Sequence, residues 1–169
     1  KIVRRSPIPC SHISGSAFHR RPGVVHQRRP PYDVPTSQRR DNAANLGLAD
    51  RAAFLRTGWA DGLADAGFDL VTSNPPYIRS EEIATLDPEV REHDPHLALD
   101  GGSDGLDAYR ALVPETLRVL KPLGVFVVET GWNQAEQVQA LFAEAGFENL
   151  RIVQDLGARD RVVTGTRPA

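Results

Sequence analysis

The chain has 169 residues, a hydrophobic content of 40%, a charged content of 25% and a formal net charge of −2. This length and composition fit one soluble domain with a core of its own. No apolar run approaches the roughly 18 residues that a membrane-spanning helix needs, and no signal-peptide pattern opens the chain. A single cysteine, Cys10, excludes an internal disulfide and is typical of a reducing compartment, so we expect a cytoplasmic protein.

Residues 1–40 differ in character from the rest of the chain. They contain no leucine and no glutamate, hold six prolines, and carry a net charge of +8, whereas residues 41–169 carry −10. No helical or alternating pattern persists in them, and too little apolar surface is present to offset the entropy that ordering costs. We therefore predict an aberrant, basic, disordered segment over 1–40 and a folded region over 41–169.

From Asp41 onward, helical and strand patterns alternate. The predicted elements, in chain order, are a helix end closed by Gly47, a short strand at 51–55, a buried strand at 68–73, a helix within 104–124, a second buried strand at 124–130, a helix at 133–146, and strands at 150–156 and 161–167. Pro114 should kink or divide the first long helix. This alternation predicts an α/β doubly wound sheet, and the last two strands, with no helix between them, predict an antiparallel hairpin at its edge.

The stretch Asn74-Pro75-Pro76-Tyr77 directly follows the predicted buried strand 68–73. Ligands of open α/β sheets bind beyond the carboxyl ends of the strands, so this stretch lies where a site is expected. The side-chain oxygen of Asn74 and the carbonyl oxygen of Pro75 can accept the two hydrogens of a planar NH₂ group, on which Tyr77 can stack. Such acceptors help to release the nitrogen lone pair for attack on an oriented electrophile. The alternative is a rigid turn without a chemical role.

From about Asn42 to Pro168, the chain resembles the C-terminal part of the release-factor glutamine methyltransferases, the HemK/PrmC type. The residues that carry the match are FDLVTSNPPYI, EVREHDPHLALDGGSDGLDAYR, LKPLGVFVVETGWNQ and DLGARDRVVTGTR. Asn-Pro-Pro-Tyr alone is shared with amino methyltransferases that act on adenine, and the combination is more specific. The resemblance implies a Rossmann-like class I methyltransferase fold and S-adenosylmethionine as cofactor. It also implies, as substrate, the glutamine amide in the Gly-Gly-Gln loop of peptide-chain release factors.

The resemblance also implies roles for single residues. Asn74, Pro75, Pro76 and Tyr77 would form the catalytic clamp on the glutamine amide, and Asn74 would also lie near the methyl donor. Trp59 would pack against the adenine of the cofactor, with a tryptophan of the core or rim as the equal alternative.

Other positions stay open between a role in the site and a structural one. Glu92 and Pro95 lie either in a loop over the substrate or in a solvated linker. Glu129 ends a strand, and its side chain either faces the site or has a structural capping role. For residues 101–107 we favour a turn and helix cap. His93 and His96 do not predict a metal site, because no third ligand has a suitable spacing.

In this family, residues 1–40 should hold a strand, a glycine-rich Asp-x-Gly-x-Gly turn, a helix and a second strand that ends in an acid. The segment offers only Ser14-Gly15-Ser16 and one acid, Asp33, neither in that context. We favour a frameshift or wrong gene start joined to a true C-terminal part, over a genuine basic arm or an unusual cofactor site. The N-terminal strands of the sheet should then be missing or replaced. The strand at 51–55 should be short, exposed or unpaired.

The function that we expect is protein-(glutamine-N5) methyltransferase, inactive in this chain as it stands. The first alternative is an adenine-N6 methyltransferase of nucleic acid, which the acidic region 41–169 disfavours. The second is a non-catalytic remnant that cannot hold its cofactor. The sequence contains no methionine, so we also expect a fragment.

Overall fold

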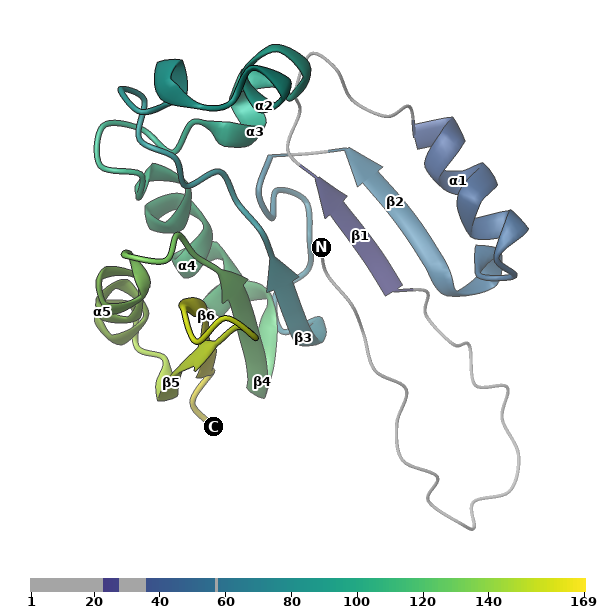
Figure 1. The fold of residues 1–169 in the computed structure, drawn as a ribbon. Helices are drawn as coiled ribbons and strands as arrows, with labels where there is room; N and C mark the ends of the chain where they lie inside the picture. The colour runs from purple at the N-terminus through teal and green to yellow at the C-terminus, as the bar shows by residue number, and fades with distance from the viewer. Residues whose placement is uncertain (1–22, 28–35, 57) are drawn as a thin grey trace, which may run out of the picture.

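The computed structural model describes residues 23–27, 36–56 and 58–169. Its first sheet has two strands, β1 (Gly23–Gln27) and β2 (Ala52–Arg56), which pair in parallel from Gly23 opposite Ala52 to Gln27 opposite Arg56. Helix α1 (Thr36–Asn45) lies beside β2, and the short 3-10 helix η1 (Ala49–Arg51) leads into that strand (Figure 1).

The second sheet has four strands in the order β3-β4-β6-β5. Its strands are β3 (Phe68–Ser73), β4 (Leu120–Glu129), β5 (Glu148–Gln154) and β6 (Asp160–Thr166). Strands β3 and β4 are parallel, whereas β6 is antiparallel to both β4 and β5. The predicted antiparallel pair at the sheet edge is therefore confirmed.

Taken together, the two sheets follow the strand order of a doubly wound fold from which one central strand is absent among the described residues. That fold begins 3-2-1-4-5, with the first strand of the chain in the middle. The described strands give β2-β1 and then β3-β4, all with their carboxyl ends pointing the same way (Figure 1). Among the described residues, no strand fills the central place between β1 and β3.

Helices α4 (Asp107–Val119) and α5 (Ala135–Ala145) cover one side of the second sheet and pack against each other (Figure 1). The core beneath α5 is aromatic: the Phe126 and Phe142 rings stack with centroids 4.8 Å apart, and Phe147 lies 4.9 Å from Phe142. The apolar stripe of α5 thus faces β4, as its helical spacing predicts.

Most of the predicted elements are found, with shifted ends. Strand β3 covers the predicted residues 68–73. Helix α5 is capped at its C-terminus by Gly146, whose φ of 95° suits only glycine well. Helix α4 continues through Pro114 without being divided. Strand β4 starts at Leu120, earlier than predicted. Three short helices that were not predicted follow β3: η2 (Ile83–Thr85), α2 (Pro88–His93) and α3 (His96–Leu99).

The expectation for residues 1–40 differs from the structure at two places. Residues 23–27 form β1, and α1 already begins at Thr36. The adjacent Val24 and Val25 favour a strand that has a parallel neighbour. The strand near 51–55 was expected to be short, exposed or unpaired. It is short, with five residues, and Leu55 is 44% exposed, but it is paired with β1. The remainder of the predicted aberrant segment, 1–22 and 28–35, lies outside the described residues.

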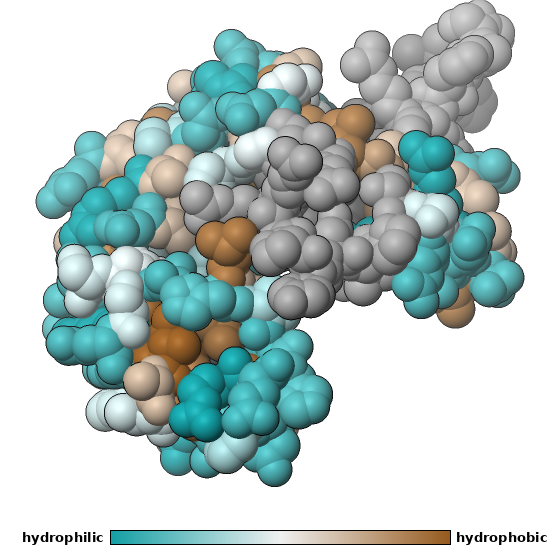
Figure 2. All heavy atoms as spheres, turned by 90° about the horizontal axis from the view of Figure 1, so that it is seen from above, coloured by the Kyte–Doolittle hydropathy of each residue, from teal (hydrophilic) through white to brown (hydrophobic). Residues whose placement is uncertain are grey.

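No helix among the described residues is long and apolar enough to cross a membrane. Seen from above, the described surface is mostly hydrophilic, with small hydrophobic areas between the polar ones (Figure 2).

Candidate active site

The four predicted clamp residues lie directly beyond the carboxyl end of β3. Pro75 and Pro76 are buried, Tyr77 is half-buried and Asn74 is exposed. The side chain of Asn74 is therefore available at the surface, on a backbone that the buried prolines hold in place. The structure thus puts all four residues together at the sheet edge where α/β proteins bind ligands.

A second loop, residues 99–105, fixes the backbone that follows the clamp. The N–H of Ile78 donates to the carbonyl of Leu99 at 3.0 Å, and the N–H of Gly101 donates to the carbonyl of Ile78 at 2.8 Å. The two segments therefore run side by side as a short parallel bridge between Ile78 and Asp100.

Two glycines allow this close approach. A Cβ on Gly101 would lie 2.9 Å from the Tyr77 Cα, and one on Gly105 would lie 2.5 Å from the Tyr77 carbonyl oxygen. Gly105 also has a φ of +77°, which side-chain-bearing residues rarely adopt. Gly101 and Gly105 therefore allow the 99–105 loop to pack directly against the backbone of Tyr77.

The predicted turn at 101–107 is present, whereas the predicted helix cap is not: α4 begins without a side-chain cap hydrogen bond. The carboxylate of Asp104 accepts the Leu106 N–H at 3.1 Å and pairs with the guanidinium of Arg110. The Arg110 hydrogen bond is the main reason that the pKa of Asp104 falls to about 2. Hydrogen bonds from Ser80 and from the Gly102 N–H likewise lower the pKa of Asp100.

Gln134 joins three loops at the back of the clamp. Its side-chain nitrogen donates to the Tyr77 carbonyl at 3.0 Å and lies 3.4 Å from the Gly105 carbonyl, while its oxygen accepts the Gly131 N–H at 3.1 Å. The residue is only 5% exposed, so these bonds form away from water. Sequence reasoning did not single out Gln134.

The side chain of Tyr77 points to a charged pair. Its hydroxyl lies 3.4 Å from Glu129 Oε1 and 3.2 Å from Arg161 Nη2, and these two charged groups are 3.0 Å apart. The Glu129 side chain therefore contacts one of the predicted clamp residues. Its backbone carbonyl accepts the hydroxyl of buried Tyr109 at 2.9 Å. Burial raises the pKa of the Tyr109 phenol above its ordinary range.

No role was predicted for Arg161, which lies within the matching stretch DLGARDRVVTGTR. The sequence held one signal for it, because Arg161 opens the predicted strand 161–167 and is the second residue of β6, which pairs with the strand that Glu129 ends. Their contact depends on the β4–β6 register, in which Glu129 faces Val162. A pattern along one strand does not contain that register.

The remaining predicted residues lie further from this network. Trp59 is half-buried and packs against the core cluster, which fits its alternative role in the core. Glu92 lies within α2, and Pro95 directly precedes α3. Among the described residues, no group of three metal-ligating side chains occurs. His93 and His96 therefore belong to no such group.

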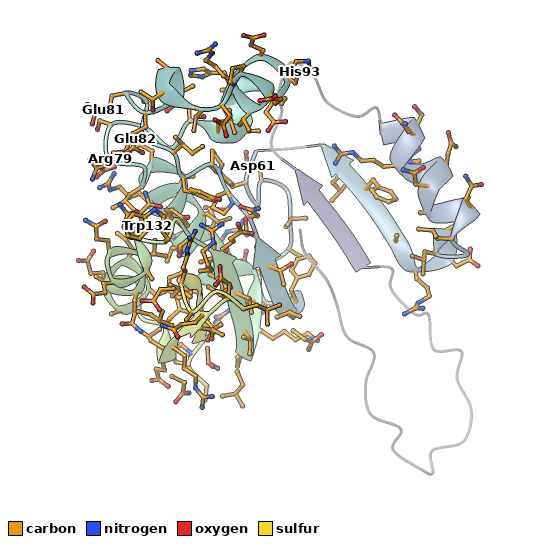
Figure 3. All side chains as sticks on the ribbon, in the orientation of Figure 1. Asp61, Arg79, Glu81, Glu82, His93 and Trp132 are labelled. Atoms are coloured by element: carbon orange, nitrogen blue, oxygen red, sulfur yellow. The ribbon has the colours of Figure 1, made fainter. Side chains whose placement is uncertain are left out.

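Several polar and aromatic side chains surround this edge. Figure 3 shows Asp61, Arg79, Glu82 and Trp132 beyond the carboxyl ends of β3 and β4. Trp132 is 65% exposed and follows the end of β4 by three residues.

Comparisons with known proteins give close relatives for most of the chain. No family model matches it. Over 128 residues, it is 59% identical to the release factor glutamine methyltransferase of Caulobacter vibrioides, covering 76% of this chain and 44% of the relative. Proteins of the same name from Agrobacterium fabrum and Geobacter sulfurreducens are 48% and 43% identical, over 75% and 84% of this chain. The chain spans less than half of the length of these relatives, from 43% to 49%.

Solved structures match the fold at low sequence identity. The S-adenosylmethionine-dependent methyltransferase SibL aligns with a TM-score of 0.56 and 16% identity, covering 86% of this chain and 43% of that one. A SAM-dependent O-methyltransferase from Thermotoga maritima aligns with a TM-score of 0.56 and 11% identity, covering 87% of this chain and 51% of that one. These matches confirm the predicted Rossmann-like methyltransferase fold.

Proposed function

We propose that the chain, which aligns over about three quarters of its length with release factor glutamine methyltransferases, is the C-terminal part of a protein-(glutamine-N5) methyltransferase domain. The proposed substrate is the glutamine amide in the Gly-Gly-Gln loop of a peptide-chain release factor, met in the cytoplasm. The observation that carries the proposal is the placement of Asn74 to Tyr77 at the carboxyl end of β3, on a backbone held from two sides. Neither the described residues nor the names of the relatives favour a nucleic-acid substrate.

In the proposed reaction, the clamp orients the substrate amide and polarises it. The Asn74 side-chain oxygen and the Pro75 carbonyl oxygen accept the two amide hydrogens. Because the prolines and the contacts of Gln134 fix this backbone in advance, little reorganisation is needed when charge develops on the nitrogen. The Tyr77 ring supplies a flat surface for the amide plane.

S-adenosylmethionine is the methyl donor expected for this family, with Trp59 and Asn74 as its proposed contacts. The described residues do not fit it completely. Strand β1 ends at Gln27, where the family's acid would be expected, and no described strand fills the central place beside it. The sequence also lacks an Asp-x-Gly-x-Gly turn. We therefore propose that this chain alone does not catalyse methyl transfer.

A chimaera tests the proposed function without relying on residues 1–40. Residues 41–169 would replace the matching region of the Caulobacter vibrioides relative, which supplies its own N-terminal part. Purified chimaera, cofactor and release factor would be incubated, and the glutamine of the Gly-Gly-Gln loop examined by peptide mass spectrometry. We expect a methyl group on that glutamine. A folded chimaera that binds the cofactor and leaves this glutamine unmodified contradicts the proposed substrate.

A further inference from the structure

The phenol of Tyr77 is held by side chains from two other strands. Its hydroxyl is within hydrogen-bond distance of Glu129 Oε1 at 3.4 Å and of Arg161 Nη2 at 3.2 Å. Glu129 is the last residue of β4 and Arg161 the second residue of β6, and these two strands are paired. Three separate segments therefore meet at one hydroxyl group.

The hydrogen-bonding capacity of this hydroxyl is already used. A phenol has one hydrogen to donate, which goes to the carboxylate of Glu129, and it accepts from the guanidinium of Arg161. Tyr77 is thus left with its ring, rather than its hydroxyl, to offer a substrate.

The same guanidinium also lies over the ring. The central carbon of Arg161 is 5.6 Å from the centroid of the Tyr77 ring, a distance at which a cation and an aromatic face attract each other. The guanidinium therefore lies nearest the hydroxyl end of one ring face, and the opposite face is the freer one for a planar substrate group.

The backbones of Glu129 and Arg161 are themselves held by hydrogen bonds. The Glu129 carbonyl accepts the hydroxyl of Tyr109, which is fully buried, and the Thr130 N–H donates to the Arg161 carbonyl at 2.9 Å. The side chains of Arg161 and Glu129 are 27% and 35% exposed, so solvent screens their attraction. Their contribution is one of geometry more than of stability.

We propose that Arg161, together with Glu129, is a positioning residue of the amide clamp: it holds Tyr77 in one rotamer and leaves one ring face for the substrate amide. This inference rests on the proposed function for its purpose. The arrangement of the three side chains can be tested apart from it. The hydrogen bond to Tyr77 and the charge of Glu129 raise the pKa of Arg161, so the guanidinium stays charged.

The rotamer of Tyr77 is measured first, on the full chain. Tyrosine-labelled protein has three tyrosines, and Tyr77→Phe assigns the signal of Tyr77 by its loss. Three-bond couplings between Hα and Hβ then report whether χ1 occupies one well or several. We expect one rotamer in the parent chain, averaging in Arg161→Gln, and return toward one rotamer in Arg161→Lys.

Lys121→Gln is the matched control. Lys121 pairs with Asp69 at 2.7 Å across β3 and β4, with comparable exposure, near the opposite ends of these strands. The control should leave Tyr77 unchanged. If Tyr77 keeps a single rotamer in Arg161→Gln, the positioning role is overturned, whatever the chain's activity.

Binding of a release factor with an intact Gly-Gly-Gln loop, measured on the chimaera, supplies the second measurement. A release factor with that glutamine replaced by alanine serves as reference. Arg161→Gln should weaken binding of the intact factor about tenfold, as expected when a charge-assisted contact is lost. It should have no further effect in a Tyr77→Ala background, because Arg161 acts through Tyr77.

The two measurements separate the two proposals. Averaging of Tyr77 without any binding of release factor supports the positioning role and contradicts the proposed substrate. Equal losses from Arg161→Gln with and without Tyr77 show that Arg161 does not act through that residue, and this overturns the inference.

Discussion

Asn74 is the residue on which the proposed chemistry depends most. In the active chimaera, Asn74→Ala removes one of two acceptors aimed at the amide, so we expect turnover to fall by about a hundredfold or more. Cofactor affinity, measured by calorimetry, should change little. Since Asn74 is exposed, the fold should tolerate the change, and a circular dichroism melt checks this. Unchanged turnover would reject the clamp.

Gln134 allows a residue-scale test of stability. Gln134→Leu leaves the partly buried Tyr77 carbonyl and the buried Gly131 N–H without their partner, which costs about 1–3 kcal/mol. Urea denaturation of the full chain measures the loss. Gln137→Leu, on the exposed side of the same helix, is the control and should change the free energy of unfolding far less. Equal effects of the two substitutions would argue against a bridging role for Gln134.

At the scale of elements, local patterns predicted what depends on neighbours in sequence. The run Phe68–Ser73 predicted β3 to the residue, and Gly146 marked the end of α5. Strand β1 was missed because five residues carry too weak a signal without their partner β2. The network at the clamp was missed because Tyr77 and Arg161 lie 84 residues apart and meet only through sheet register.

The aromatic cluster under α5 is the element-scale feature with the largest expected energy. Phe142 is fully buried between the Phe126 and Phe147 rings. Phe142→Ala should destabilise the chain by about 3–5 kcal/mol. Glu144→Ala, exposed on the same helix, should be nearly neutral. Chemical denaturation of both variants makes the comparison, and a small loss for Phe142→Ala would mean that α5 is not essential to the core.

At the scale of the whole molecule, the described part of the chain holds the proposed clamp but not all of the groups expected to bind the cofactor. We therefore expect no heat of binding when the full chain is titrated with S-adenosylmethionine, while the chimaera binds it. A carboxylate bound at free backbone N–H groups at a helix start is the interaction that the missing glycine turn would supply. Micromolar binding by the chain alone would show that residues 1–40 supply a cofactor site of another kind.

The separation of the strands into two hydrogen-bonded sheets has a consequence for how the molecule opens. Strand β4 has partners on both sides, β3 and β6, whereas β1 and β2 have only each other in the described part of the chain. Two cooperative units of unequal strength follow, because a lone pair of strands is marginal by itself. In deuterium exchange, the amides of β2 should lose protection at a far lower opening energy than those of β4. The four-stranded sheet next to the proposed clamp would then stay closed while the β1–β2 pair opens.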